Sequence, residues 1–177
     1  MLDLPIFIIL FLAIITVFGT AAWAGLLAAP FVPTKKKDIK RMLTLAQVKA
    51  SDQIYELGSG DGRIAQVAAK EFGARVQGIE ISFLPYIISK IRMRLTGLSD
   101  RVKIAYGNFY KVDLKNADVV ICFLTPMAMK KLSPKFRKEL KQGARVVSYA
   151  FPLKDWSPQK VNKPHKGDVA VFLYGID

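Results

Sequence analysis

The sequence is poor in the residues that bind metals and form disulfides. Among 177 residues there is one cysteine, Cys122, and one histidine, His165. A single cysteine excludes a disulfide scaffold, and the Cys/His spacing of a zinc site is absent. His165 follows a lysine and a proline in a polar stretch, so we expect it to be a surface residue. There is no Gly-Lys-Ser/Thr motif, which excludes a P-loop.

Positive charge is absent from the first 34 residues, whose one charged side chain is Asp3. All 27 lysines and arginines of a chain with a formal net charge of +13 therefore lie in residues 35–177. The apolar and the basic residues thus belong to different segments, although 51% of the whole chain is hydrophobic. We accordingly divide the chain into a leading segment, residues 1–34, and one globular domain, residues 35–177, long enough to bury a core.

The stretch from Leu4 to Val32 is uncharged, and about 20 apolar residues in a helix suffice to cross a bilayer. Lysines and arginines crowd directly after it, in residues 35–41. By the positive-inside rule, the domain then lies on the cytoplasmic side or in an equivalent compartment such as a mitochondrial matrix. A cleaved secretory signal, with a site at residues 22–24, is the alternative, but no basic residue precedes the apolar run. We expect a single transmembrane helix and a hinge.

Strand and helix patterns alternate through residues 35–177. We expect strands at residues 54–57, 74–79, 102–106, 118–124, 144–151 and 168–176. We expect helices at 39–46, after Gly62, at 84–95, and from an N-cap at Ser133 with Pro134 in the first helical position. Such an α/β chain predicts an open, mostly parallel sheet with helices on both faces and a ligand site beyond the carboxyl ends of its strands.

An acidic glycine loop follows the first predicted strand, in the segment ELGSGDGR of residues 56–63. Its glycines permit positive φ and let a ligand touch the backbone, while the loop amides face that ligand. Glu80 ends the second strand, where an acid is placed to accept both hydroxyls of a ribose. Together the two features predict a nucleoside-type ligand, and a purely structural turn is the alternative.

The charge of this loop discriminates between nucleoside ligands. A dinucleotide places a pyrophosphate over a G-x-G-x-x-G loop that keeps carboxylates away from it. Here the spacing is G-x-G-x-G, and the carboxylates of Glu56 and Asp61 would repel a pyrophosphate. S-adenosylmethionine carries a sulfonium and an α-ammonium and no phosphate, so the loop favours that ligand.

With these motifs the sequence resembles the class I, seven-stranded, Rossmann-like methyltransferases. More narrowly, it is similar to the membrane-anchored protein-lysine methyltransferases of mitochondria that act on the adenine nucleotide translocase and on the c-subunit of ATP synthase, and to their prokaryotic relatives. The similarity runs through MLTLAQVKASDQIYELGSGDGRIAQVAAK, the GIE that ends at Glu80, NFYKVDLKNADVVICFL and KFRKELKQGARVVSYAFP.

This resemblance implies S-adenosylmethionine as the cofactor. The cofactor-binding residues that it indicates are Glu56, Gly58, Ser59, Gly60, Asp61, Gly62, Glu80, Ile81, Asn108 and Phe109. The loop residues would hold the methionine part, Glu80 the ribose, and Asn108 with Phe109 the adenine.

The acceptor site is less defined, because the exit from the fourth strand matches no acceptor motif of the resembling enzymes. We expect substrate contacts at Thr125, Pro126 and Tyr149. An amino-DNA methyltransferase would need Asn/Asp-Pro-Pro-aromatic at this exit, and the sequence lacks it. Methyl transfer is an in-line displacement at an activated carbon, so no metal and no obligatory general base are required, and we assign no catalytic residue. Asp113 is expected in a turn or cap.

Lysines and arginines are spread over the predicted helix surfaces, which makes anionic lipid headgroups the first expected partner and nucleic acid the second. We expect a membrane-anchored S-adenosylmethionine-dependent methyltransferase that modifies a lysine of a membrane protein. One alternative keeps the cofactor but makes the acceptor a lipid headgroup or a small amphiphile. Another is a tethered nucleoside-binding module without catalysis.

Overall fold

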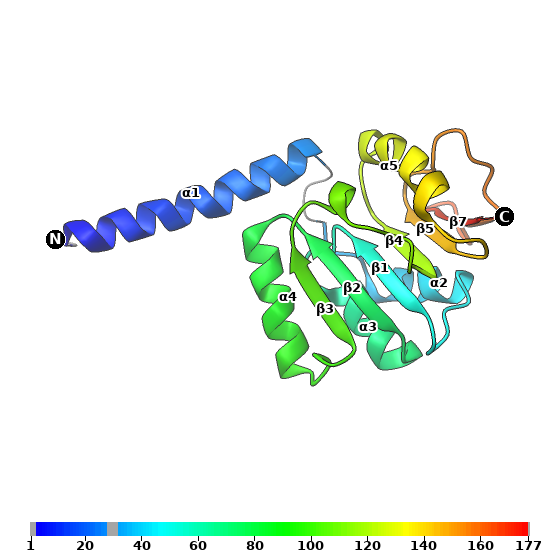
Figure 1. Cartoon of the computed structure of the whole chain (residues 1–177), viewed down its shortest axis with the longest axis horizontal. Coiled ribbons are helices and arrows are strands. Elements are labelled where there is room, and N and C mark those ends of the chain that lie inside the picture. The colour runs from blue at the N-terminus through cyan, green and yellow to red at the C-terminus, as the bar shows by residue number, and fades with distance from the viewer. Residues whose placement is uncertain (1–2, 28–31, 177) are drawn as a thin grey trace.

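A seven-stranded sheet forms the centre of the domain (Figure 1). The computed structural model describes residues 3–27 and 32–176, and the side chains of residues 21–27 lie outside that description. The strands are β1 (Gln53–Leu57), β2 (Arg75–Glu80), β3 (Val102–Tyr106), β4 (Val119–Cys122), β5 (Arg145–Tyr149), β6 (Lys160–Asn162) and β7 (Val171–Gly175). Their order is β3-β2-β1-β4-β5-β7-β6, with β1 to β5 parallel, β7 antiparallel to β5, and β6 antiparallel to β7. The predicted open, mostly parallel sheet is confirmed.

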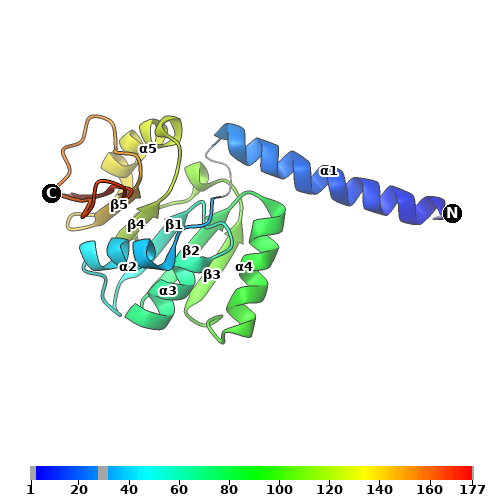
Figure 2. The same cartoon turned by 180° about the vertical axis from the view of Figure 1, so that it is seen from behind.

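Helices cover both faces of this sheet (Figures 1 and 2). They are α2 (Lys36–Leu45), α3 (Arg63–Phe72), α4 (Phe83–Leu95) and α5 (Pro126–Glu139), with a short 3-10 helix at Phe109–Lys111. The buried residues of α2, α3 and α4 form one apolar cluster, and those of α5 and of residues 109–117 form the other. Because side chains alternate along a strand, β4 contributes Val119 and Ile121 to the first cluster and Val120 and Cys122 to the second. Its continuous apolar run is thus explained by burial on both faces.

Helix α5 begins earlier than predicted. Thr125, not Ser133, is its N-cap, and the Thr125 hydroxyl accepts a hydrogen bond from the Ala128 amide at 3.4 Å. Pro126 occupies the first turn, and Pro134 lies inside the helix. The cap-then-proline pattern occurs at both places in the sequence, and the first occurrence starts the helix. Ser133 is buried and instead accepts a hydrogen bond from Trp156 Nε1 at 2.7 Å.

Strand β6 was not predicted, because its three residues lie in a polar stretch that we expected to be a loop. It occupies the edge of the sheet, next to β7, and is largely exposed. A short edge strand with one partner needs no alternating apolar pattern, so its sequence carries little signal.

The leading segment forms helix α1 (Leu4–Leu27). Its described apolar side chains are mostly exposed, and the Thr20 hydroxyl accepts a hydrogen bond from the Phe83 amide of α4 at 3.2 Å. Among the described residues, no helix combines the length and the apolarity required for a membrane span. The expected transmembrane helix is therefore not supported by this part of the chain.

Candidate active site

A cavity of about 400 Å³ lies at the carboxyl ends of β1 and β4. The strand order reverses between these two strands, which is where ligands bind in open α/β sheets. The cavity is lined by Val32, Pro33, Thr34, Glu56, Gly58, Ser59, Gly60, Asp61, Arg63, Ile64, Glu80, Ile81, Ser82, Phe109, Phe123, Leu124, Thr125, Ala150 and Phe151. A deep, mostly apolar site with a few convergent polar groups is typical of small-molecule binding.

The glycine loop forms the floor of this cavity. Gly58, Gly60 and Gly62 have φ values of 77°, 55° and 76°. Residues with a Cβ rarely adopt such positive φ values. The amides of Gly58 and Ser59 both donate to the carbonyl oxygen of Ile79, at 2.9 and 3.0 Å. The loop is thereby held against the end of β2, with its backbone open to the cavity.

Glu80 fixes the same loop from the end of β2. Its Oε2 accepts the Gly60 amide at 2.7 Å and its Oε1 accepts the Ser82 amide at 2.7 Å, although the residue is only 6% exposed. An ionised carboxylate offers about four acceptor positions, so two remain for the hydroxyls of a ribose. Glu80 can thus order the loop and bind a ligand at once.

Glu56 is a second buried acid, at the end of β1. Its Oε2 accepts the Ala65 amide at 3.1 Å, and the residue is 3% exposed. Burial raises the pKa of Glu56 well above its ordinary value; the Ala65 hydrogen bond opposes this shift, while the negative charges of Asp61 and Glu80 add to it. A ligand cation beside this carboxylate would relieve that unfavourable charge, as the sulfonium or ammonium of S-adenosylmethionine would.

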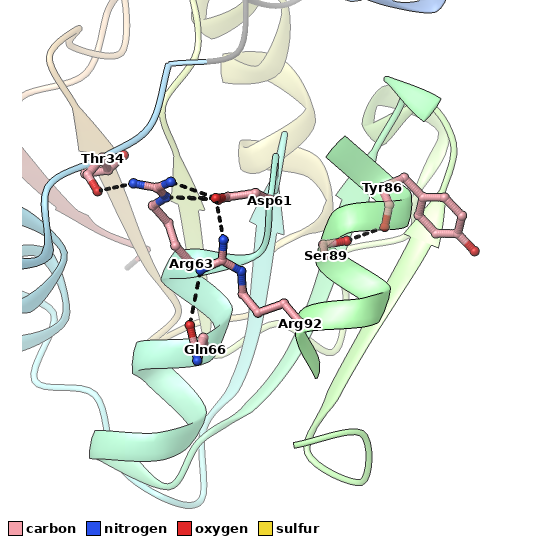
Figure 3. Close-up of polar contacts among 7 residues, drawn as sticks. All are labelled: Thr34, Asp61, Arg63, Gln66, Tyr86, Ser89 and Arg92. Atoms are coloured by element: carbon pink, nitrogen blue, oxygen red, sulfur yellow. Dashed lines mark hydrogen bonds and ion pairs between the residues drawn. The ribbon is translucent and has the colours of Figure 1, made fainter. Parts of the chain in front are cut away.

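Asp61 is neutralised by two arginines (Figure 3). Its Oδ2 lies 2.7 Å from Arg63 Nη2 and 2.8 Å from Arg92 Nη2, and Arg92 comes from α4. Burial tends to raise the pKa of Asp61, but the hydrogen bond from Arg63 and the charge of Arg92 outweigh it and hold the pKa below its ordinary value. Asp61 therefore stays ionised but is already paired, unlike Glu56.

Arg63 also joins the glycine loop to the segment that precedes α2. Its Nη1 donates to the carbonyl oxygen of Thr34 at 3.4 Å, while its other guanidinium nitrogens bind Asp61 (Figure 3). Val32, Pro33 and Thr34 consequently form one wall of the cavity. Sequence reasoning missed Arg63 and Thr34 as site residues. The arginine that closes ELGSGDGR was the available signal for the first, and nothing local marked the second.

Aromatic side chains also line the cavity. Phe123 follows β4, Phe151 follows β5, and Phe109 opens the short 3-10 helix. Ala150, beside Phe151, has a φ of 74° without being a glycine. Strained backbone of this kind is concentrated at functional sites, so we regard the β5 exit as part of the site.

The Ser59 hydroxyl is buried and has no hydrogen-bond partner among the described residues. Ser59 itself lines the cavity, and a buried hydroxyl without a partner is costly. The buried acids and the loop amides together fit a cationic nucleoside.

Most of the residues predicted for the site line the cavity. Those that do are Glu56, Gly58, Ser59, Gly60, Asp61, Glu80, Ile81, Phe109 and Thr125. Gly62, the last glycine of the loop, packs against Ser89 and Met93 of α4. Asn108 borders a neighbouring cavity with Ile81 and accepts the Tyr110 amide at 2.9 Å.

The remaining predicted residues lie elsewhere. Pro126 begins α5 and does not line the cavity, whereas the hydroxyl of Tyr149 donates to Asp38 Oδ2 at 3.0 Å on the α2 side of the sheet. Burial, followed by this bond to Asp38, raises the pKa of Tyr149 to about 12. His165 is exposed, and Asp113 accepts the Lys115 amide in a turn. Within residues 3–27 and 32–176 there is no cluster of His, Cys, Asp and Glu able to hold a metal ion.

Comparison with known proteins identifies the family of this chain. Residues 56–160 match the ANTKMT methyltransferase domain. A protein-lysine N-methyltransferase of Saccharolobus islandicus is 41% identical, over 83% of this chain and 93% of its own length. The human lysine N-methyltransferase of the ATP synthase c-subunit is 31% identical over 84% of this chain, which spans 63% of that protein.

A solved structure shares both the fold and the sequence pattern. The RNA methyltransferase from Salinibacter ruber, in complex with S-adenosyl-L-homocysteine, has a TM-score of 0.79 and 36% identity, covering 82% of this chain and 94% of its own. These relatives confirm the expected cofactor, S-adenosylmethionine, and the expected class of enzyme. The chain belongs to the ANTKMT methyltransferase domain family and is an S-adenosylmethionine-dependent protein-lysine N-methyltransferase.

Proposed function

We propose that this enzyme works at a membrane and methylates a lysine of a membrane protein. The observation that carries the proposal is the wall formed by Val32, Pro33 and Thr34, which end the leading segment and line the same cavity as the acidic loop. An acceptor held near the leading segment would therefore be close to the active site.

We assign the cofactor contacts as follows. S-adenosylmethionine supplies a methyl group activated by its sulfonium. Glu56 and the loop from Gly58 to Gly60 would hold the charged methionine part, Glu80 the ribose, and Ile81 with Phe109 the adenine. Asp61, paired with Arg63 and Arg92, would act by shaping the loop. Gly62 and Asn108 would contribute through the backbone that they order.

The acceptor side of the cavity would be the wall formed by Phe123 and Phe151. Phe123 and Phe151 exclude water and guide an unbranched side chain, which aligns a neutral lysine amine for in-line displacement. Thr125 is the polar residue of this wall, and Pro126 holds it at the start of α5. Tyr149 would act indirectly, because its ring meets the Phe123 ring edge to face, with centroids 4.8 Å apart.

Membrane attachment would come from residues 1–34, and catalysis from residues 35–177. The uncharged stretch from Leu4 to Val32 and the basic residues 35–41 support this division and a cytoplasmic or matrix-facing domain. Confinement to the surface of a membrane raises the effective concentration of an embedded acceptor. It also offsets the repulsion between a basic enzyme and a basic substrate.

The test is to incubate source membranes and full-length enzyme with S-adenosylmethionine labelled in its methyl group. We expect label in protein and methyl-lysine after hydrolysis, with flotation of the enzyme on vesicles. Gly60→Arg, at a cavity-lining position with a φ of 55°, is the inactive control, and Gly167→Ala, in open space, is the active one. Label in lipid alone would refute the lysine acceptor, and label in RNA alone would assign this chain the acceptor named for the Salinibacter ruber enzyme.

A further inference from the structure

Helix α4 presents an apolar stripe to the outside of the domain. Leu84, Ile88, Ile91 and Leu95 are 48%, 41%, 51% and 82% exposed. Their spacing of four, three and four residues puts them on one face of the helix. An apolar face with this spacing normally packs on a core. The spacing therefore predicted a helix correctly, but in the structure this face of the helix is exposed.

The glycine loop explains why α4 is turned this way. The helix buries Ser89 and Met93 instead, which are 0% and 3% exposed. A Cβ on Gly62 would lie 3.0 Å from Ser89 Cβ and 3.4 Å from Met93 Cε, so the loop and α4 are in close contact. The Ser89 hydroxyl meets its hydrogen-bonding need within the helix, donating to the Tyr86 carbonyl at 2.6 Å (Figure 3). Packing against the loop requires a small residue here, and the stripe consequently faces away.

The stripe lies on the side of the domain from which α1 departs. Helix α4 flanks β3, the edge strand of the sheet, and Thr20 of α1 is hydrogen-bonded to Phe83 at its first turn. Figures 1 and 2 show α1 leaving the domain on the α4 side and running crosswise to α4. A flat surface perpendicular to the axis of α1 would therefore lie parallel to the axis of α4 and could contact α4 along its length.

The charges beside the stripe select the partner. Helix α4 contains no acidic residue, and Lys90 and Arg94 are exposed along one side of the stripe. Large apolar residues flanked by basic ones are the pattern of a helix that lies in the interface of an anionic membrane. Two copies of the chain packed through this face would bring like charges together.

We propose that α4 docks on an anionic lipid bilayer, with Leu84, Ile88, Ile91 and Leu95 entering the headgroup region. The proposal rests on the membrane association proposed above and names the surface that makes the contact. Ser82, the residue before α4, lines the active-site cavity. Docking along α4 therefore holds one end of the cavity near the lipid surface, where an embedded acceptor would be reached.

The experiment uses full-length protein with one fluorescent label. Cys122 is fully buried and should not react with a dye. The variant Ile91→Cys therefore provides the accessible thiol for an environment-sensitive nitrobenzoxadiazole dye. Val161→Cys is the matched control, since Val161 is 54% exposed on β6 at the opposite edge of the sheet. Leu95→Cys, at the most exposed position of the stripe, serves as a second variant that leaves packing undisturbed.

On vesicles of phosphatidylcholine with phosphatidylglycerol, we expect emission from the dye at position 91 or 95 to shift to the blue and rise by about twofold or more, as it leaves water for lipid. Lipids brominated on their acyl chains should quench it. Phosphatidylcholine alone should give a smaller change, and the dye at position 161 should give none. These results would support docking through α4.

Other outcomes overturn it in distinguishable ways. Protein that floats with the vesicles while the dye at positions 91 and 95 is unchanged would refute docking through α4 and leave membrane association intact. Protein that does not float would refute both proposals. A blue shift without vesicles that grows with protein concentration would show that a second copy of the chain covers the stripe, which also refutes docking on lipid.

Discussion

Gly78→Ala tests whether the glycine loop depends on close packing against β2. A Cβ on Gly78 would lie 2.6 Å from Ile104 Cδ1 and 2.9 Å from both Cβ and Oγ of Ser59. Ile104 Cδ1 is the end of a flexible side chain and can turn aside. Ser59 Cβ is attached to the loop backbone, so ordinary contact can be restored only if the loop retreats by about 0.5–1 Å.

The energetic consequence has two opposing parts. Overpacking of this kind costs about 1–3 kcal/mol, whereas replacing glycine by alanine restricts the unfolded chain and returns about 0.4–1 kcal/mol. We therefore expect a net loss of about 0.5–2 kcal/mol in the free energy of unfolding. A misplacement of about 1 Å between reacting groups can lower the rate of an enzyme about 100-fold. We expect the shifted loop to weaken S-adenosylmethionine binding by about tenfold.

Isothermal titration calorimetry with S-adenosylmethionine, and urea denaturation of the unliganded protein, measure the two effects. Gly167→Ala is the control, because a Cβ there meets nothing within 4 Å. We expect both a modest loss in the free energy of unfolding and a large loss of affinity for S-adenosylmethionine. An unchanged dissociation constant for Gly78→Ala would refute the argument that contact with Ser59 positions the loop.

Three further predictions concern the buried charges. Because the pKa of Glu56 is raised, its carboxylate is protonated as the pH falls through that raised value, so S-adenosylmethionine affinity should decline there. Glu56→Gln should lack this step in calorimetry across pH and, in the unliganded protein near neutrality, unfold at a higher temperature than the wild type. Arg92→Gln should lower stability by about 1–2 kcal/mol at neutral pH. The loss should shrink in acid, because the lowered pKa of Asp61 means that its stabilising charge is lost as the pH falls through that value; an equal loss at all pH values in urea denaturation would contradict the pairing. Tyr149→Phe should cost about 1–2 kcal/mol with unchanged cofactor affinity, since Tyr149 serves Asp38 and not the cavity.

Local sequence patterns predicted the parts of the fold that depend on neighbours in the chain. The apolar run of β4, the glycine loop with its two acids, and the helices that follow β1 and β2 were all foreseen. The start of α5 was predicted wrongly: we expected it at Ser133-Pro134, whereas the same cap-then-proline pattern at Thr125-Pro126 begins the helix. β6 was missed because an exposed edge strand carries no apolar alternation.

Many of the expected site residues that line the cavity come from one continuous segment, and the contacts that sequence reasoning missed join distant segments. Glu80 was predicted because the end of the second strand follows from the alternation of strands and helices. The contact of Arg92 with Asp61, and that of Arg63 with Thr34, join residues far apart in sequence. Tyr149 was expected near substrate as an aromatic residue at a strand end, but the pleat of β5 directs it to the other side, toward Asp38.

The sequence by itself predicted that this chain forms a mostly parallel α/β sheet and that it carries an acidic glycine loop suited to a cationic nucleoside, and it showed that basic charge begins only after an uncharged stretch. These are properties of composition and short-range spacing, which survive without knowledge of long-range contacts. Only the tertiary structure decided that Asp61 is paired with arginines, and which face of α4 is buried. Both depend on packing across the sheet: the arginine that neutralises Asp61 comes from α4, and the close approach of Gly62 to Ser89 turns the apolar stripe of that helix outward.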